Sequence, residues 1–279
     1  MARTGARPAD RPTRLAGDSA DNLLTATFFQ SSQISGLDGN DTLTGSYRAD
    51  TIDGGRGNDV IADGDTAFIF AADRMTGGAG DDRITTGGGA DTIDGGAGID
   101  RVTIQLGAST ADIVMSGSFG TGRTASFSNG LTVTNVEQAT IFTGGGNDYV
   151  LLGDLGGFLT TVLGDDTGIG GLGNDTLDLG PGDNLATGGA GADLFLCLNG
   201  TTTITDFSFA AGDRVQVVVE GYVSAAAAIA DGFVRLVDDA AGLQVQVDFD
   251  GPAGSGAFVT AAILQGLTAD AVGTEFLLV

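Results

Sequence analysis

Residues 77–85 read Gly-Gly-Ala-Gly-Asp-Asp-Arg-Ile-Thr, and four other stretches of nine share this pattern: 54–62, 95–103, 170–178 and 188–196. Each has glycine at positions one, two and four, Asp at position six and a large apolar residue at position eight. Counted in nines, one register covers sixteen units, in residues 27–62, 68–103 and 134–205. A five-residue break at 63–67 interrupts it. Position six is Asp in eleven units, and position eight is large and apolar in fourteen.

The pattern predicts stacked turns. Glycine permits positive φ and close backbone approach, so the first six residues can turn sharply and expose carbonyl oxygens. The last three residues suit a short strand whose central side chain points inward. One such strand cannot bury its apolar side chain alone, so the units must stack. A Gly/Asp-rich disordered linker is the alternative, but disorder gives no reason for a large apolar residue at every ninth position.

The nonapeptide G-G-x-G-x-D-x-U-x resembles the calcium-binding repeat of the RTX (hemolysin-type) family. This resemblance implies a right-handed parallel β-roll in which two units make one coil and calcium ions lie in the loops. It also implies a bacterial protein exported by a type I secretion transporter, which reads an uncleaved C-terminal signal and needs no N-terminal leader. The fold class we expect is therefore all-β: a parallel β-roll with a small β-rich C-terminal module.

The register and the composition together divide the chain. We expect a disordered N-terminal tail at 1–15 and the roll at 16–205, which leaves the register in an excursion at 104–133. A β-rich capping or secretion module should follow at 206–279. Alternating apolar residues at 215–219 and 243–249 predict half-buried antiparallel strands there, and Ser224–Ala230 is the expected short helix.

The composition limits the chemistry. The net charge of the 279 residues is −24, with no histidine, no tryptophan and no lysine, and 33 of the 36 acidic residues are Asp. This charge excludes nucleic acid as a general partner. The sequence contains no apolar run of ~18 residues, the length that a membrane-spanning helix needs. Cys197 is expected to be a buried, unreactive thiol. Without histidine or lysine as a general base, we expect no enzyme, and a glycosidase that uses only carboxylates remains a remote alternative.

Calcium takes six to eight oxygen ligands from carboxylates and backbone carbonyls. Two loops on the same side of the roll lie one coil apart, so the sixth-position aspartates should form stacked pairs that clamp calcium: Asp41 with Asp59, Asp73 with Asp91, Asp82 with Asp100, Asp148 with Asp166, and Asp175 with Asp193. The expected carbonyl ligands belong to the loop glycines: Gly36, Gly39, Gly54, Gly55, Gly57, Gly77, Gly78, Gly80, Gly95, Gly96, Gly98, Gly144, Gly146, Gly170, Gly171, Gly173, Gly188, Gly189 and Gly191.

Departures from the pattern predict weak or missing sites. Five units lack Asp at position six and should break the sites to which they belong: those with Ser32, Ala139, Gly157, Asn184 and Thr202. Asp50 is a doubtful ligand because the break at 63–67 interrupts its next coil. Asp206 and Asp213 resemble the segment that closes many RTX blocks, and they hold either one more ion or only a strand end.

Two functions share this chemistry. The first is a secreted, extracellular or cell-surface calcium-binding protein that folds on meeting calcium and acts, without catalysis, through surface, matrix or partner contacts. The second is a calcium-driven export and folding module of a toxin or exoenzyme system. The final residues, Glu275 to Val279, are either an export signal or a last strand.

Overall fold

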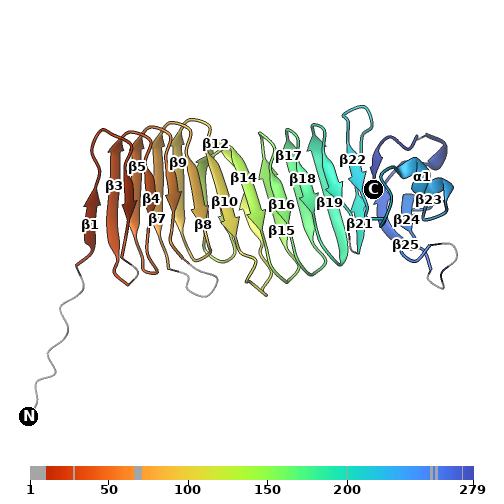
Figure 1. The fold of residues 1–279 in the computed structure, drawn as a ribbon, viewed down its shortest axis with the longest axis horizontal. Coiled ribbons are helices and arrows are strands. Elements are labelled where there is room, and N and C mark those ends of the chain that lie inside the picture. Colours follow the sequence, from red (N-terminus) through yellow and green to blue (C-terminus); the bar gives the residue numbers. More distant parts are fainter. Residues whose placement is uncertain are drawn as a thin grey trace, which may run out of the picture. The chain divides into compact units, whose positions relative to one another are not determined.

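The computed structural model describes residues 11–27, 29–65, 71–198, 200–251, 254, 257–271 and 273–279. The chain forms two compact units (Figure 1). The first contains Met1–Gln105 and Phe119–Glu137, and the second contains Leu106–Ser118 and Gln138–Val279. Each unit therefore contains part of the excursion at 104–133. Among the described residues, no helix has the length and apolar character needed to cross a membrane.

The first unit is built from two parallel sheets. One sheet runs in the order β1 (Thr13–Ala16), β3 (Ser32–Asp38), β5 (Thr51–Arg56), β7 (Arg74–Ala79), β9 (Thr92–Ala97) and β13 (Thr132–Val136). The other runs in the order β2 (Leu23–Thr25), β4 (Thr42–Thr44), β6 (Val60–Ala62), β8 (Arg83–Thr86) and β10 (Arg101–Gln105). Consecutive strands of the chain alternate between the sheets, so each coil contributes one strand to each. The parallel β-roll predicted from the repeats is confirmed.

Eighth-position residues form the core, as the register predicts. In the first sheet Ile34 is level with Ile52, Ile52 with Met75, and Met75 with Ile93. All four side chains are at most 2% exposed. The pairing of β5 with β7 spans the break at 63–67 without a change of register. The break therefore leaves the stacking of β5 on β7 unchanged.

The ends of the first unit differ from the expected boundaries. β1 begins at Thr13 and pairs in parallel with β3, so part of the segment expected to be a tail is a strand. Residues 1–10 lie outside the described residues. In the excursion, β12 (Gly120–Phe127) pairs antiparallel with β13.

The second unit also has two sheets. One runs in the order β14 (Gln138–Phe142), β16 (Phe158–Thr160), β18 (Thr176–Asp178), β20 (Leu194–Leu196), β22 (Arg214–Gln216) and β26 (Leu277–Leu278). The other runs in the order β15 (Tyr149–Gly153), β17 (Thr167–Leu172), β19 (Asp183–Ala190), β21 (Thr201–Ile204), β25 (Val259–Leu264), β24 (Gly242–Val247) and β23 (Val234–Asp239). β11 (Met115–Gly117) belongs to this unit and contacts β15.

One of the two small eighth-position residues has a packing reason. A methyl group on Gly168 would lie 2.8 Å from Cδ2 of Leu179 and 2.9 Å from Cδ2 of Leu159. Both leucines are buried, so they already occupy the space that a larger residue at position 168 would need. The unit at 161–169 therefore keeps the register, and the side chains of Leu159 and Leu179 fill the core at the level of Gly168.

Past residue 205 the sheets continue instead of stopping. β22 pairs in parallel with β20, so the antiparallel arrangement expected for this strand is wrong, because it extends the roll by another coil. β24 is antiparallel to both β23 and β25, as predicted. The predicted helix is α1 (Ala225–Ala230), and the Ser224 side chain caps it by accepting a hydrogen bond from the Ala227 N–H. A 3-10 turn, η1 (Ala269–Ala271), precedes β26.

Candidate calcium-binding loops

The sixth-position aspartates form hydrogen-bonded ladders along the edges of each unit. In each step, the backbone N–H of one Asp donates to Oδ1 of the equivalent residue in the next coil. Asp41 donates to Asp59 (2.7 Å), Asp59 to Asp82 (2.7 Å) and Asp82 to Asp100 (2.8 Å). The other predicted pairs follow the same rule: Asp73 with Asp91, Asp148 with Asp166, and Asp175 with Asp193. The structure thus brings all five predicted pairs together.

The second oxygen of these carboxylates is buried and has no hydrogen-bond partner. This holds for nine Oδ2 atoms among the described residues: those of Asp41, Asp59, Asp73, Asp82, Asp100, Asp148, Asp166, Asp175 and Asp193. Each of these side chains is at most 3% exposed. An ionised oxygen that is removed from water without a partner is strongly destabilising, so these loops need a positive or proton-donating partner. At Asp148 and Asp166, where burial raises the carboxyl pKa, the hydroxyls of Thr143 and Thr161 lie near enough to lower it in part.

The first glycine of the motif is required by the carboxylate that follows it. A methyl group on Gly36 would lie less than 3 Å from Oδ2 of Asp41, and the same holds for Gly54 with Asp59. The same relation recurs in the remaining regular loops, in Gly77 with Asp82, Gly95 with Asp100, Gly170 with Asp175, and Gly188 with Asp193. The carboxylate therefore folds back over its own loop, into space that only glycine leaves open.

The fourth glycine allows carbonyl groups to stack. Gly57 has φ 122°, and a methyl group on it would lie less than 3 Å from the Gly39 carbonyl oxygen of the preceding coil. Gly80 and Gly98 repeat this relation with Gly57 and Gly80. Both sets of predicted ligands, the glycine carbonyls and the Asp carboxylates, thus lie along the same loops.

The electrostatics of the loops favour a cation. Burial, and then the charge of neighbouring carboxylates, raises the pKa of Asp82 to about 7, of Asp73 to about 8 and of Asp100, beside Glu137, to about 6. In the second unit, burial and the charge of Asp193 raise the pKa of Asp175 to about 7. Since no proton-donating side chain meets these oxygens, ionised loops need an external positive charge.

Asn184 shows what an uncharged residue does in the same position. Its Oδ1 keeps the ladder bond from the Asp166 N–H (2.8 Å), while its Nδ2 donates to the Gly180 carbonyl (2.9 Å). An Asp has an oxygen in place of that amide nitrogen, so it has no proton to offer. A cation that binds the carboxylate and nearby carbonyls supplies the missing attraction.

The donor set fits a hard cation. It consists of carboxylate and carbonyl oxygens, which calcium prefers. Cys197 is buried, and burial raises the pKa of its thiol to about 12, so it offers no thiolate. Soft or borderline ions such as zinc need thiolate or imidazole ligands. The residues present therefore fit calcium.

The doubtful candidates have different surroundings. Asp50 joins the ladder across the break, since its N–H donates to Oδ1 of Asp73 (2.6 Å). Asp213 continues the second unit's ladder by accepting from the Asp193 N–H (3.0 Å). Both oxygens of Asp206 accept backbone N–H groups, from Gly188 and Gly189. Both carboxylate oxygens of Asp206 are therefore already bound to backbone N–H groups. This favours a role for Asp206 at the end of a strand over a role as an ion ligand.

Sequence reasoning missed a second ladder at position five. There the hydrogen bonds run the opposite way, from the N–H of one coil to the side chain of the preceding coil. Asn58 donates to Asn40 (2.7 Å), Asp81 to Asn58 (2.8 Å) and Ile99 to Asp81 (2.8 Å). The frequent Asn or Asp at position five was the available signal.

Two residues that end the first unit's ladder were also missed. The Asn22 N–H donates to Asp41 Oδ1 (2.7 Å), and the Asp100 N–H donates to Glu137 Oε2 (2.9 Å). Asn22 is the sixth residue of a stretch that opens with Gly17, and this spacing, which is that of glycine and Asp in the regular units, was its signal. Glu137 is the fourth residue of the unit 134–142, where the pattern has glycine, so no sequence pattern indicates its role.

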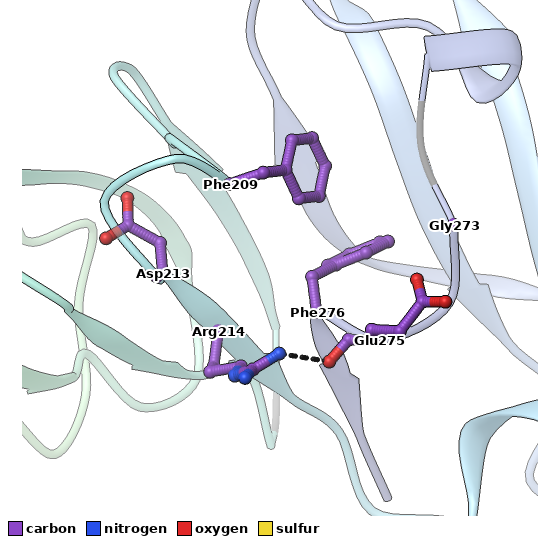
Figure 2. Close-up of a pocket in the computed structure, with 7 residues that line it drawn as sticks. Phe209, Asp213, Arg214, Gly273, Glu275 and Phe276 are labelled. Carbon is purple, nitrogen blue, oxygen red and sulfur yellow. Dashed lines mark hydrogen bonds between the residues drawn. The ribbon is translucent and has the colours of Figure 1, made fainter.

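The C-terminal residues are folded into the second unit. β26 pairs with β22, and Phe276 is buried. Figure 2 shows the Phe276 ring facing Phe209, with the ring centroids 5.3 Å apart, and Arg214 donating to the carbonyl of Glu275. The tail is therefore a last strand in the folded state.

These observations define a class: a parallel β-roll whose loops carry stacked carboxylates and carbonyls for hard cations. Residues 35–62, 71–102 and 160–195 match the family model described as the RTX calcium-binding nonapeptide repeat (4 copies). The chain is thus a calcium-binding RTX-repeat β-roll protein. A comparison with curated proteins found no match.

Proposed function

We propose that the chain is a secreted protein that folds when it meets extracellular calcium and then acts without catalysis, through surface, matrix or partner contacts. The observation that carries this proposal is the set of nine buried Oδ2 atoms that have no hydrogen-bond partner among the described residues. Stacked carboxylates repel one another, and two charges at ~5 Å interact by a few kcal/mol at an effective dielectric near 20. Calcium removes this repulsion, so binding and folding become one event.

Extracellular calcium modules commonly bind at ~10⁻⁴–10⁻³ M, far above resting cytosolic calcium. The chain would therefore stay largely unfolded inside the cell and fold outside. Circular dichroism tests this coupling. Chelator should abolish most β-structure and calcium should restore it, while magnesium should restore little because it demands a stricter octahedral geometry. An unchanged β signal in excess chelator would contradict the proposal.

Export through a type I transporter is the second part of the proposal. It is supported by the RTX repeats and by the acidic-apolar end of the chain, Glu275 to Val279. Because Phe276 and Leu277 are buried and β26 pairs with β22 in the folded state, we expect a signal in this segment to be readable only before folding. Deleting 275–279 should reduce the amount in the culture supernatant, and undiminished export would place the signal elsewhere.

The non-catalytic role rests on the residues themselves. The sequence has no histidine and no lysine, and the repeat aspartates are engaged in ladders. The alternative, an export and folding module of a toxin or exoenzyme system, uses the same calcium chemistry. Neighbouring genes help to discriminate the two functions. A type I transporter gene beside a toxin or enzyme gene whose product needs this chain for export would favour the module.

A further inference from the structure

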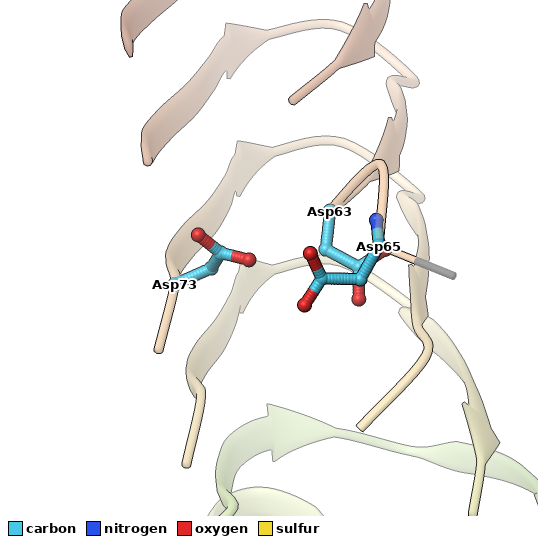
Figure 3. A group of neighbouring side chains, drawn as sticks. All are labelled: Asp63, Asp65 and Asp73. Atoms are coloured by element: carbon cyan, nitrogen blue, oxygen red, sulfur yellow. The ribbon is translucent and has the colours of Figure 1, made fainter. Parts of the chain in front are cut away.

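The break at 63–67 brings three carboxylates together at one place in the first unit. Asp63 and Asp65 follow β6 directly, and Asp73 directly precedes β7. One oxygen of each lies within 4.8 Å of one oxygen of each of the other two. Figure 3 shows the Asp73 carboxylate pointing across toward Asp63 and Asp65. The two ends of the inserted loop therefore meet through acidic side chains.

Hydrogen bonds within the loop account for only part of this cluster. Asp63 accepts from the Asp65 N–H (3.1 Å) and the Gly87 N–H (2.5 Å), and Asp65 Oδ2 accepts from the Ala71 N–H (2.7 Å). Two buried oxygens are left with no hydrogen-bond partner: Asp65 Oδ1 and Asp73 Oδ2. The Asp73 side chain is 3% exposed, so water does not compensate for the missing partner.

Nothing positive offsets the charge of the cluster. None of the three carboxylates forms an ion pair with a described basic residue. Asp50 and Asp91 lie close enough to add their own charges to the field at both Asp65 and Asp73. A buried group of like charges is stable only when paired or bound to a metal.

The cluster extends beyond the nonapeptide repeats, with which it shares only Asp73. Asp63 and Asp65 lie between the matched segments 35–62 and 71–102, and the loop lacks the glycine pattern of the repeat. We propose that Asp63, Asp65 and Asp73 form an additional site for a hard divalent cation, calcium, which joins the two ends of the break. The proposal rests on the proposed function only in that the chain meets calcium.

Three carboxylates from one loop should bind tightly. Calcium affinity rises with the number of charged ligands and the rigidity of the site, and Asp63 and Asp73 are held in the roll by β6 and β7. The ion would also hold closed a connection longer than the others of this edge, whose closure costs more chain entropy. We therefore expect this site to fill at lower calcium than the regular loops.

The Asp65→Asn variant tests the site. Asparagine keeps an oxygen for the Ala71 N–H but removes the charge and a ligand. The matched control is Asp53→Asn, which removes the same charge from an exposed position on β5. Bound calcium is counted by native mass spectrometry over a calcium titration, with circular dichroism to verify folding. Asp65→Asn should bind one ion fewer, lost from the tightest class, and Asp53→Asn should match the parent.

Asp63→Asn provides a second variant, since its amide oxygen can still accept from the Asp65 N–H. It should lose the same ion, whether or not Asp65→Asn folds. An unchanged ion count and affinity in the folded variants would overturn the additional site. Asp82→Asn separates the two proposals: if it loses an ion while Asp65→Asn does not, only the additional site fails. If the parent binds no calcium at all, both fail.

Discussion

The two edges of the first unit are built from the same repeat but treat its irregularities differently. The regular edge has loops at 36–41, 54–59, 77–82 and 95–100, each with glycine first and Asp sixth. The broken edge has loops at 45–50, 63–65 with 71–73, and 86–91; Thr86 replaces the first glycine of the last, and Asp63 opens the interrupted loop. Both edges keep an unbroken Asp ladder. Stacking thus depends on position six, whereas the second oxygen differs between the edges, since on the broken edge the Thr86 hydroxyl meets Asp91 Oδ2.

The largest expected effect comes from the core that both edges share. Ile93→Asp places a charge where the side chain is fully buried between coils. We expect a loss of more than about 4 kcal/mol, which abolishes folding even in calcium. Thermal unfolding followed by circular dichroism measures it, with Thr92→Asp on the exposed face of β9 as the control. A parental melting temperature for Ile93→Asp would show that the register is wrong.

Alanine at the two edges should separate the roles of the loop glycines. A methyl group on Gly77, in the regular edge, would lie less than 3 Å from Asp82 Oδ2, whereas one on Gly87, in the broken edge, would meet nothing closer than 3.6 Å. Gly77→Ala should cost about 1–3 kcal/mol by displacing the carboxylate and should lose a bound ion. Gly87→Ala should leave both stability and ion count near the parent. Equal effects in calcium-dependent melting would contradict the contact assigned between Gly77 and the Asp82 carboxylate.

pH should alter the calcium-free and calcium-bound proteins in opposite directions. On the regular edge the pKa of Asp82 is raised to about 7, and on the broken edge that of Asp73 to about 8, mainly by burial. The folded chain then binds more protons than the unfolded chain between about pH 4 and 8, so the calcium-free fold loses stability as pH rises through this window. In chelator, acidification from pH 8 to 5 should restore β-structure.

With calcium present, the same protons compete with the ion, so affinity should fall as pH falls. Calorimetric titration at pH 8 and pH 6 measures this. Asp82→Asn is the control, since it removes one titrating carboxylate and should weaken the pH dependence on the regular edge. A calcium-free fold that is least stable in acid would contradict the raised pKa values.

Position eight predicted the fold because each core residue contacts its counterpart one coil away, so spacing alone fixes the packing. Position six predicted the stacked carboxylates for the same reason. The roles of Glu137 and of the Asp63–Asp65–Asp73 cluster could not be predicted, because they depend on how the chain around the excursion and the break brings distant residues together in space. The path of β22 also escaped prediction. Alternation of Val215 and Val217 indicates a strand but does not reveal whether its partner is parallel.

The smallest expected effect is a gain of calcium binding on the broken edge. The Thr86 hydroxyl donates to Asp91 Oδ2, so this carboxylate is not among those left without a partner. Thr86→Gly restores the first glycine of the unit, which then reads Gly-Gly-Gly-Gly-Ala-Asp91, and frees Oδ2. We expect one additional calcium ion, or tighter binding near Asp91, at a cost of about 0.5–1 kcal/mol to the calcium-free fold from the flexible glycine.

Thr85→Gly is the matched control, since it introduces the same residue at the preceding position of β8 but frees no carboxylate. Native mass spectrometry should show the extra ion in Thr86→Gly alone. If both variants bind as many ions as the parent, the hydroxyl is not what separates the two edges. The difference in calcium binding between the two edges would then come from the positions of the backbone carbonyls, which depend on the glycines elsewhere in each loop.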